Sequence, residues 1–195
     1  MKKRRKTMAL LTKATRKKWF KLLGYEYNKD GILKMQKKYF KREKDCDGIY
    51  GQNTDKLLRH LHHVNVYTEN FKPEEFRCTC GHCTGYPTWM RVNELKNIQT
   101  IRTHYGKPMT ITSGLRCSYE NAKLAGSSRE SKHMEGKAVD FYMPGVTDTL
   151  ANRRAAVNYI KRLKNHNYTY GNGISSKEAN VSAPNMGNAL HTEVR

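Results

Sequence analysis

The first third of the chain carries apolar residues at helical spacing in three successive stretches. The first stretch covers residues 12–23 and leads into Gly24, a residue type that favours the end of a helix. The second covers residues 32–42, and after a loop with two glycines Asn53 or Thr54 is expected to cap the third. The apolar positions of the second and third stretches are Ile32, Leu33, Met35, Tyr39, Phe40, Leu57, Leu58, Leu61 and Val64. The pattern predicts a small three-helix module over residues 12–64.

From residue 65 onward, short strand-like runs alternate with helical stretches. A helix is expected from Thr88 to Gly106, and another is marked by Ala156, Val157, Ile160 and Leu163. Strands are expected at residues 109–112, 138–143 and 189–194, where β-branched and other apolar residues cluster. Strands mixed with helices predict an α+β domain over residues 65–195, with residues 1–11 left as a basic tail.

Charge narrows the class of partner. The 195 residues include 37 Lys and Arg against 17 Asp and Glu, a formal charge of +20, and the mean hydropathy is −0.87. Residues 1–42 hold 16 of these cations against Glu26 and Asp30, a net charge of +14. No apolar run approaches the roughly 18–20 residues of a membrane span, so we expect no membrane insertion. A polyanion is the expected partner, either a nucleic acid or an anionic polymer of the cell envelope.

The start of the chain bears on localisation. The apolar run after the basic opening residues covers only residues 8–11, and further cations follow it at residues 16–18. That run is too short for the apolar core of a signal peptide. We therefore expect a protein made in the cytoplasm without a signal peptide.

The segment from Ser131 to Asp140 holds the most informative chemistry. Gly136, Ala138 and Asp140 alternate, so on a strand they would share one face and leave space before the carboxylate. His133 comes just ahead of that strand, and near the end of the chain His191 and Glu193 stand two residues apart. Two histidines and one aspartate would give a zinc ion three protein ligands. The open fourth position is typical of catalytic rather than structural zinc.

These residues resemble a known family. The sequences SGLR at residues 113–116, Asn121, SxHxxGxAxD at residues 131–140 and LHTEV at residues 190–194 resemble the zinc D-Ala-D-Ala carboxypeptidases. That family includes the vancomycin-resistance dipeptidase and phage L-alanyl-D-glutamate endopeptidases. The resemblance implies a zinc peptidase domain with a central antiparallel sheet flanked by helices. It also implies that the zinc ligands are His133, Asp140 and His191, that Arg116 stabilises the substrate carboxylate or the oxyanion, and that Ser131 and Asn121 bind substrate.

One position departs from many relatives. They carry a catalytic glutamate three residues before the last histidine, where this chain has Asn188. The sequence instead resembles the branch that ends in His-x-Asp, with Glu193 in place of the aspartate. Glu193 is therefore assigned as the general base, and the alternative is that it only orients His191. Asn188 and Tyr170 are further candidates for the wall of the cleft.

The N-terminal module has a resemblance of its own. DGIYGQNTDKLL, at residues 47–58, is similar to the small three-helix peptidoglycan-binding domain, whose pattern reads DGxxGxxT…L. Gly48 and Gly51 would shape the loop and Thr54 would cap the next helix. The pairing of this module with the peptidase implies that the partners are bacterial peptidoglycan and anionic wall polymers, with no specific nucleic acid, and we expect a monomer. An unrelated helical bundle is the alternative.

The other cysteine and histidine clusters permit several interpretations. Cys78, Cys80, Cys83 and Cys117 could hold a second, structural zinc, form disulfides or remain free thiols, while Cys46 stands apart. Three histidines, His60, His62 and His63, are read as part of a solvated helix end rather than as a metal site.

Taken together, these features predict a zinc peptidase that hydrolyses amide bonds in peptidoglycan stem peptides, of the kind found in phage or prophage endolysins. Such an enzyme would act on the bacterial cell wall. One alternative is a catalytically inactive wall-binding adaptor. Another is a basic nucleic-acid-binding protein with a zinc-knuckle-like cysteine cluster, which would leave the segment at residues 131–140 unexplained.

Overall fold

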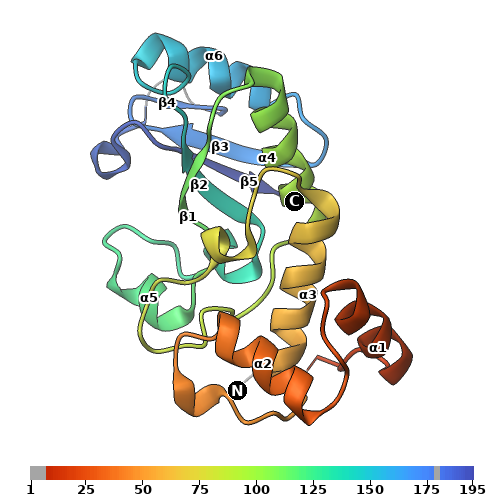
Figure 1. Ribbon diagram of the computed structural model, residues 1–195. Coiled ribbons are helices and arrows are strands. Elements are labelled where there is room, and N and C mark those ends of the chain that lie inside the picture. The colour runs from red at the N-terminus through yellow and green to blue at the C-terminus, as the bar shows by residue number, and fades with distance from the viewer. Residues whose placement is uncertain (1–7, 178–180) are drawn as a thin grey trace.

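The computed structural model describes residues 8–177 and 181–195, so most of the expected basic tail lies outside the described residues. Its centre is a five-stranded antiparallel sheet in the order β1-β2-β5-β3-β4 (Figure 1). The strands are β1 (Thr110–Ser113), β2 (Ala138–Tyr142), β3 (His166–Gly171), β4 (Ile174–Ser175) and β5 (Leu190–Val194). Together with six helices in the described part of the chain they form the expected α+β fold.

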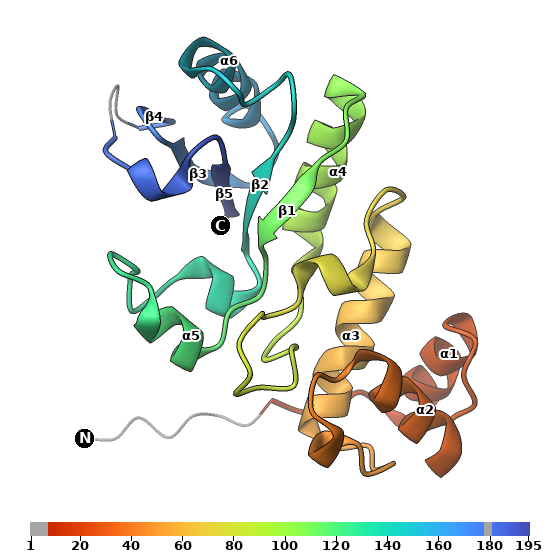
Figure 2. The ribbon, with the colours of Figure 1, turned by 60° about the vertical axis from the view of Figure 1, so that its left-hand side comes forward.

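One face of the sheet is packed against helices α4 (Val92–Tyr105) and α6 (Leu150–Ile160) (Figures 1 and 2). The side chains of this packed face and of the two helices belong to the main hydrophobic core: Leu95, Ile98, Ile101, Val139, Phe141, Ala156, Val157, Ile160 and Leu190. Because successive side chains of a strand point to opposite faces, the residues between them lie on the other face. That other face is available for polar chemistry.

The N-terminal helices α1 (Lys13–Leu22), α2 (Lys29–Tyr39) and α3 (Gln52–Tyr67) lie beside one another at one end of the molecule (Figure 2). Side-chain oxygens of Thr12 and Asn28 cap the first two helices and satisfy backbone N–H groups there. The helix predicted at residues 32–42 begins three residues earlier, because Asn28 provides this cap. α3 contacts both α1 and α2, so the three helices pack together.

The prediction that Asn53 or Thr54 caps the third helix is wrong. Gly51 occupies the N-cap position, and Thr54 lies buried inside the first turn of α3. The Thr54 hydroxyl donates to the carbonyl of Ile49 and accepts from the Gln36 amide, so it ties the loop to α2.

The interpretation of the histidines on α3 as a solvated helix end is also wrong. His60 has no exposed surface, and its Nε2 contacts the carbonyl of Pro73 at 2.9 Å. His62 stacks on Trp19, and His63 contacts the carbonyl of Met90. α3 continues past residue 64 to Tyr67 and packs against α4, so this end of the helix meets residues 73–105 instead of solvent.

Gly136 does not share a strand face with Asp140 as the sequence pattern suggested. It precedes β2 with a φ of +70°, and an added Cβ would lie 2.0 Å from the carbonyl oxygen of Trp89. The glycine thus allows the backbone around residue 136 to lie directly against residues 89–90.

β3 and β4 are not among the strands expected from the sequence. Separately, within residues 8–177 and 181–195 the helices lack the length and apolar character that crossing a bilayer requires.

Candidate active site

The register of three neighbouring strands gathers the site on the open face of the sheet. Asp140 on β2 is paired directly with His191 on β5, and His191 is paired on its other side with Tyr170 on β3. Two residues further along β5, Glu193 is paired with Ala138 on β2 and with Tyr168 on β3. The period of two along β5 therefore turns His191 and Glu193 to the same side, as expected.

His133 reaches this row from η3, a single 3-10 turn at Lys132–Glu135. Its Nδ1 donates to the carbonyl oxygen of Gly114 at 2.7 Å, which fixes the orientation of the ring. Its Nε2 then faces Asp140 Oδ1 at 3.3 Å and His191 Nδ1 at 3.3 Å. The third side of the triangle joins His191 Nδ1 to Asp140 Oδ1 at 2.8 Å.

These three residues form a group that could hold a metal ion. With the outer nitrogens donating to the carbonyl of Gly114 and to Glu193, the inner nitrogens can each give a lone pair to a cation. Binding of a cation would replace the hydrogen bonds that the inner nitrogens make with the Asp140 carboxylate in its absence. Around tetrahedral zinc, ligands at about 2.0–2.1 Å lie roughly 3.3 Å from one another, close to the separations observed here. The donor set fits zinc.

Burial and hydrogen bonding compete in setting the charges of this group. Burial raises the pKa of Asp140, but the hydrogen bonds with His133 and His191 outweigh that effect and hold the pKa below its ordinary value. Burial lowers the pKa of His191, whereas its hydrogen bonds with Asp140 and Glu193 raise it, with a net increase. Asp140 is therefore a carboxylate at neutral pH and can serve as an anionic ligand.

Glu193 lies against the side of His191 that points away from Asp140. Its Oε2 accepts from His191 Nε2 at 3.3 Å, and its Oε1 accepts from the side-chain amide of Asn167. Burial raises the pKa of Glu193, but the interactions with His191, Asn167 and Lys132 together lower it below its ordinary value, so this carboxylate is also ionised at neutral pH. The position suits a group that orients His191, and it also borders the cavity in which His133 and Asp140 lie.

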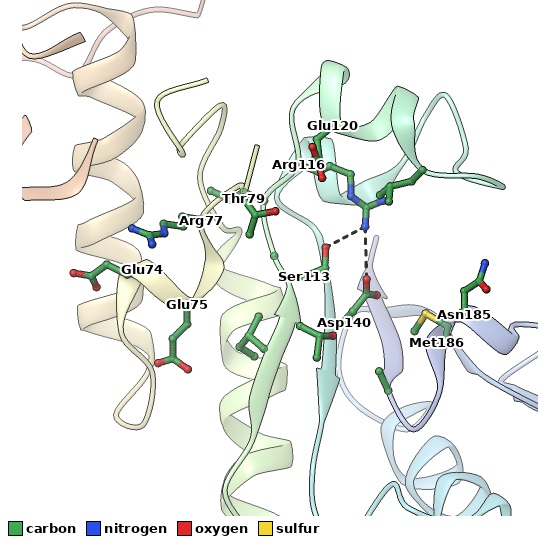
Figure 3. Close-up of a pocket in the computed structure, with 16 residues that line it drawn as sticks. Glu74, Glu75, Arg77, Thr79, Ser113, Arg116, Glu120, Asp140, Asn185 and Met186 are labelled. Atoms are coloured by element: carbon green, nitrogen blue, oxygen red, sulfur yellow. Dashed lines mark hydrogen bonds and ion pairs between the residues drawn. The ribbon is translucent and has the colours of Figure 1, made fainter. Parts of the chain in front are cut away.

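Arg116 brings a cation to the edge of the group (Figure 3). Its Nη2 lies 3.0 Å from Ser113 Oγ and 3.6 Å from Asp140 Oδ2, and its Nη1 lies 3.4 Å from Asn121 Oδ1. The guanidinium is largely shielded from solvent, with a side-chain exposure of 12%. A cation held this firmly beside an anionic ligand can stabilise negative charge that develops next to it.

Two adjoining cavities meet at this point. One, of about 610 Å³, is bordered by all three ligand candidates, by Glu193 and by the tyrosines of β3. The other, of about 520 Å³, extends towards Glu74 and Glu75 in η2 (Pro73–Phe76) (Figure 3). Both are lined by Arg116 and Asp140. The site therefore has open space on two sides.

The other predicted site residues divide into two groups. Ser131 and Tyr170 line the larger cavity. Asn121 is buried behind Arg116, where it contacts the guanidinium and the carbonyl of Ser128, and it lines neither cavity. Asn188 also lines neither cavity, because its Oδ1 accepts from Arg153 at 3.1 Å.

Three residues that the sequence analysis missed belong to the surroundings of the site. Tyr168 lines the larger cavity and Asn167 holds Glu193, and both lie on β3. The alternation of polar and aromatic residues at positions 166–170 is the signal that could have predicted this strand. Glu94 on α4 is fully buried, and neither carboxylate oxygen has a hydrogen-bond partner among the described residues. Burial, with smaller contributions from the charges of Glu193 and Asp140, raises its pKa well above the ordinary value.

The cysteines Cys78, Cys80, Cys83 and Cys117 form the second group that could hold a metal, and all five cysteines of the chain are free.

Comparison with known protein families places residues 69–175, more than half of the chain, in Peptidase M15. No curated protein matches the sequence. The matched range contains His133, Asp140 and Arg116, while His191 and Glu193 follow it on β5.

Proposed function

The chain belongs to the peptidase M15 family of metallopeptidases, and on that premise we propose that it hydrolyses amide bonds in the stem peptides of bacterial peptidoglycan. We assign it the role of a phage or prophage endolysin. One observation carries the catalytic part of this proposal. His133 and Asp140 from one short motif, and His191 from the last strand, bring their ligand atoms within 4.8 Å of one another beside a cavity and an arginine.

Each residue of the site has a role in this proposal. Zinc held by His133, Asp140 and His191 would supply Lewis-acid chemistry that activates water at neutral pH and polarises the scissile carbonyl. Glu193, ionised at neutral pH, accepts a proton from the attacking water and returns it to the leaving amine. Arg116 stabilises the negative charge that develops on the carbonyl oxygen.

The shape of the site supports cleavage within a peptide. An enzyme that removes only a terminal residue needs extended space on one side of the scissile bond. Here the two cavities open from Arg116 and Asp140 in different directions, one towards η2 and the other towards Tyr168 and Tyr170. We therefore assign an endopeptidase specificity, such as cleavage between L-alanine and D-glutamate, in preference to a D-Ala-D-Ala carboxypeptidase.

The N-terminal helices are proposed to bind the cell wall. The net charge of +14 on residues 1–42 suits attraction to anionic wall polymers, and the loop with Gly48 and Gly51 keeps the resemblance to the peptidoglycan-binding domain. Attachment to an insoluble substrate raises the effective concentration of scissile bonds near the catalytic site. Raising the salt concentration should weaken wall binding far more than it slows hydrolysis of a small soluble peptide.

A zymogram on purified cell walls, run with and without a chelator, tests the proposed activity. We expect clearing by the wild-type protein, loss of clearing on chelation, and recovery with added zinc. His133→Ala should be inactive, whereas His104→Ala is a matched control because His104 is exposed and stacks on Tyr159 outside both cavities. Wall binding without clearing would support the inactive adaptor instead, and binding to nucleic acid in preference to walls would support the nucleic-acid-binding protein.

Mass spectrometry of the released fragments identifies the bond. Fragments that begin at D-glutamate would support the endopeptidase assignment. Release of D-alanine alone, with the rest of the stem peptide intact, would contradict that assignment while leaving the peptidase itself in place.

A further inference from the structure

Four of the five cysteines come together outside the catalytic site, from two segments distant in sequence. Cys78, Cys80 and Cys83 lie in residues 77–91, which contain no helix or strand, and Cys117 follows Arg116 at the start of α5 (Ser118–Lys123). Cys80 is central, with its Sγ at 3.4 Å from Cys78, 3.5 Å from Cys83 and 3.3 Å from Cys117. All four sulfur atoms lie within 4.8 Å of one another.

These separations suit a shared metal ion better than disulfide bonds. A disulfide joins two sulfurs at about 2.05 Å and would divide the cluster into pairs. In a tetrahedral zinc site with zinc–sulfur distances of about 2.3 Å, the sulfurs lie roughly 3.8 Å apart. The cluster has one sulfur in contact with all three others, and the spacing Cys-x-Cys-x-x-Cys supplies three ligands to which Cys117 adds the fourth.

The surroundings of the cluster are suited to thiolate ligands. Backbone N–H groups of Gly85 and Glu120 donate to the sulfurs of Cys83 and Cys117, each at 3.4 Å. Zinc with four thiolates carries a net charge of −2, which favours neighbouring cations. Two cations are in place: Lys41 Nζ contacts the carbonyl of Thr79 at 2.6 Å, and Arg42 Nη1 contacts the carbonyl of His82 at 2.6 Å.

Residues 77–91 also lack the regular structure that would hold them in place. Stretches longer than about 12–15 residues without regular structure are uncommon in compact domains. Yet residues 77–91 include the buried side chains of Cys78, Tyr86 and Met90. A metal at the cluster would hold this segment to Cys117, next to Arg116 of the catalytic site. Because Lys41, which follows α2, contacts the carbonyl of Thr79, the metal would also connect the end of α2 with the loop that carries Arg116 (Figure 2).

We propose that Cys78, Cys80, Cys83 and Cys117 bind a structural zinc ion that is separate from the catalytic metal. Binding displaces the thiol protons to solvent, and no oxidant or reductant is needed. With all four positions filled by protein, this ion has no open site for water, so its contribution is to stability rather than to hydrolysis.

Metal content of purified variants tests the proposal. With zinc supplied and reducing conditions kept, the wild-type chain should contain two zinc ions, and His133→Ala should retain one. Cys80→Ser, which removes the central sulfur, should also retain one. Cys46→Ser is the matched control and should retain two, because Cys46 lies outside the cluster and its thiol donates to the carbonyl of Arg42 at 3.8 Å.

A measurement on His133→Ala keeps the test independent of whether the cysteine variants fold. Titration of this variant with a mercurial thiol reagent should release its one zinc ion as the four clustered thiols react. Cobalt substituted into the same variant should show intense thiolate-to-cobalt charge-transfer absorption. The proposal is overturned if this variant holds no zinc, if the thiols react without releasing metal, or if its mass is lower by four hydrogens, as two disulfides would require. None of these results depends on peptidase activity, so this proposal and the proposed function can fail separately.

Discussion

Replacing Glu193 by glutamine distinguishes the two roles that its position permits. The carboxylate accepts from His191 Nε2 through one oxygen and from the Asn167 amide through the other. In Glu193→Gln the amide oxygen still accepts from His191. Asn167 can turn its own oxygen towards the new N–H groups, so both contacts survive. What the variant loses is a negative charge and the capacity to accept a proton.

The two roles predict different magnitudes in different quantities. Loss of a positioned general base lowers kcat by about 10²–10⁴, which corresponds to roughly 3–5 kcal/mol of transition-state stabilisation. Loss of a group that only orients a metal ligand weakens metal affinity by about 10–100-fold. The second effect disappears when zinc is saturating, whereas the first persists. We expect the first, with the zinc bound by His133, Asp140 and His191 retained.

The assay measures hydrolysis of a soluble stem peptide at saturating zinc, alongside metal content and affinity. Asn167→Ala is the matched control, because it removes the support of Glu193 without removing the proton acceptor, and it should lower kcat by less than about 10-fold. If kcat of Glu193→Gln at saturating zinc stays within about 10-fold of the wild type, Glu193 is not the base and acts only through His191.

Three further predictions concern stability and can be checked by urea unfolding. Gly136→Ala should lower the free energy of unfolding by roughly 2–5 kcal/mol, because it adds left-handed strain and a Cβ that would clash with the carbonyl of Trp89. Gly126→Ala is the control. It has a φ of +76° and nothing within 4 Å of the added Cβ, so it should lower the free energy of unfolding by about 1 kcal/mol. Burial lowers the pKa of His60 to about 4, so the unfolding free energy should fall by up to about 3 kcal/mol as the pH drops from about 6.5 to about 4, and His60→Gln should flatten this slope. The raised pKa of Glu94 means that stability is lost as the pH rises above about 4.3. The free energy of unfolding of Glu94→Gln should therefore exceed that of the wild type by more at pH 7 than at pH 4.

Local patterns in the sequence were sufficient to predict much of the fold of residues 65–195. The α+β class and the strands β1, β2 and β5 follow from clusters of β-branched and apolar residues, and alternation along β5 places His191 and Glu193 on one side. The convergence of His133 and Asp140 follows from a short motif that spans a turn and a strand. In each case the deciding interactions lie within a few residues.

What could not be predicted depends on contacts between distant segments. His60 looks like a polar residue near a helix end, and only the packing of residues 73–90 over α3 buries it. Asn121 looks like a substrate-binding residue, but the turn after α5 directs its amide to Ser128 and places it behind Arg116. β3 has a polar, half-buried sequence, so its identity as a strand depends on pairing with β5.

The same pairing shows why the core and the catalytic site depend on each other. Leu190, Thr192 and Val194 alternate with His191 and Glu193 along β5, and these three are almost completely buried. A slip of one residue between β2 and β5 would bring Leu190 or Thr192 opposite Asp140 and turn His191 towards the helices. The same slip would turn the buried side chains of Leu190, Thr192 and Val194 towards the cavities. The burial of one face therefore fixes the register, and the register brings the proposed metal ligands together on the other face.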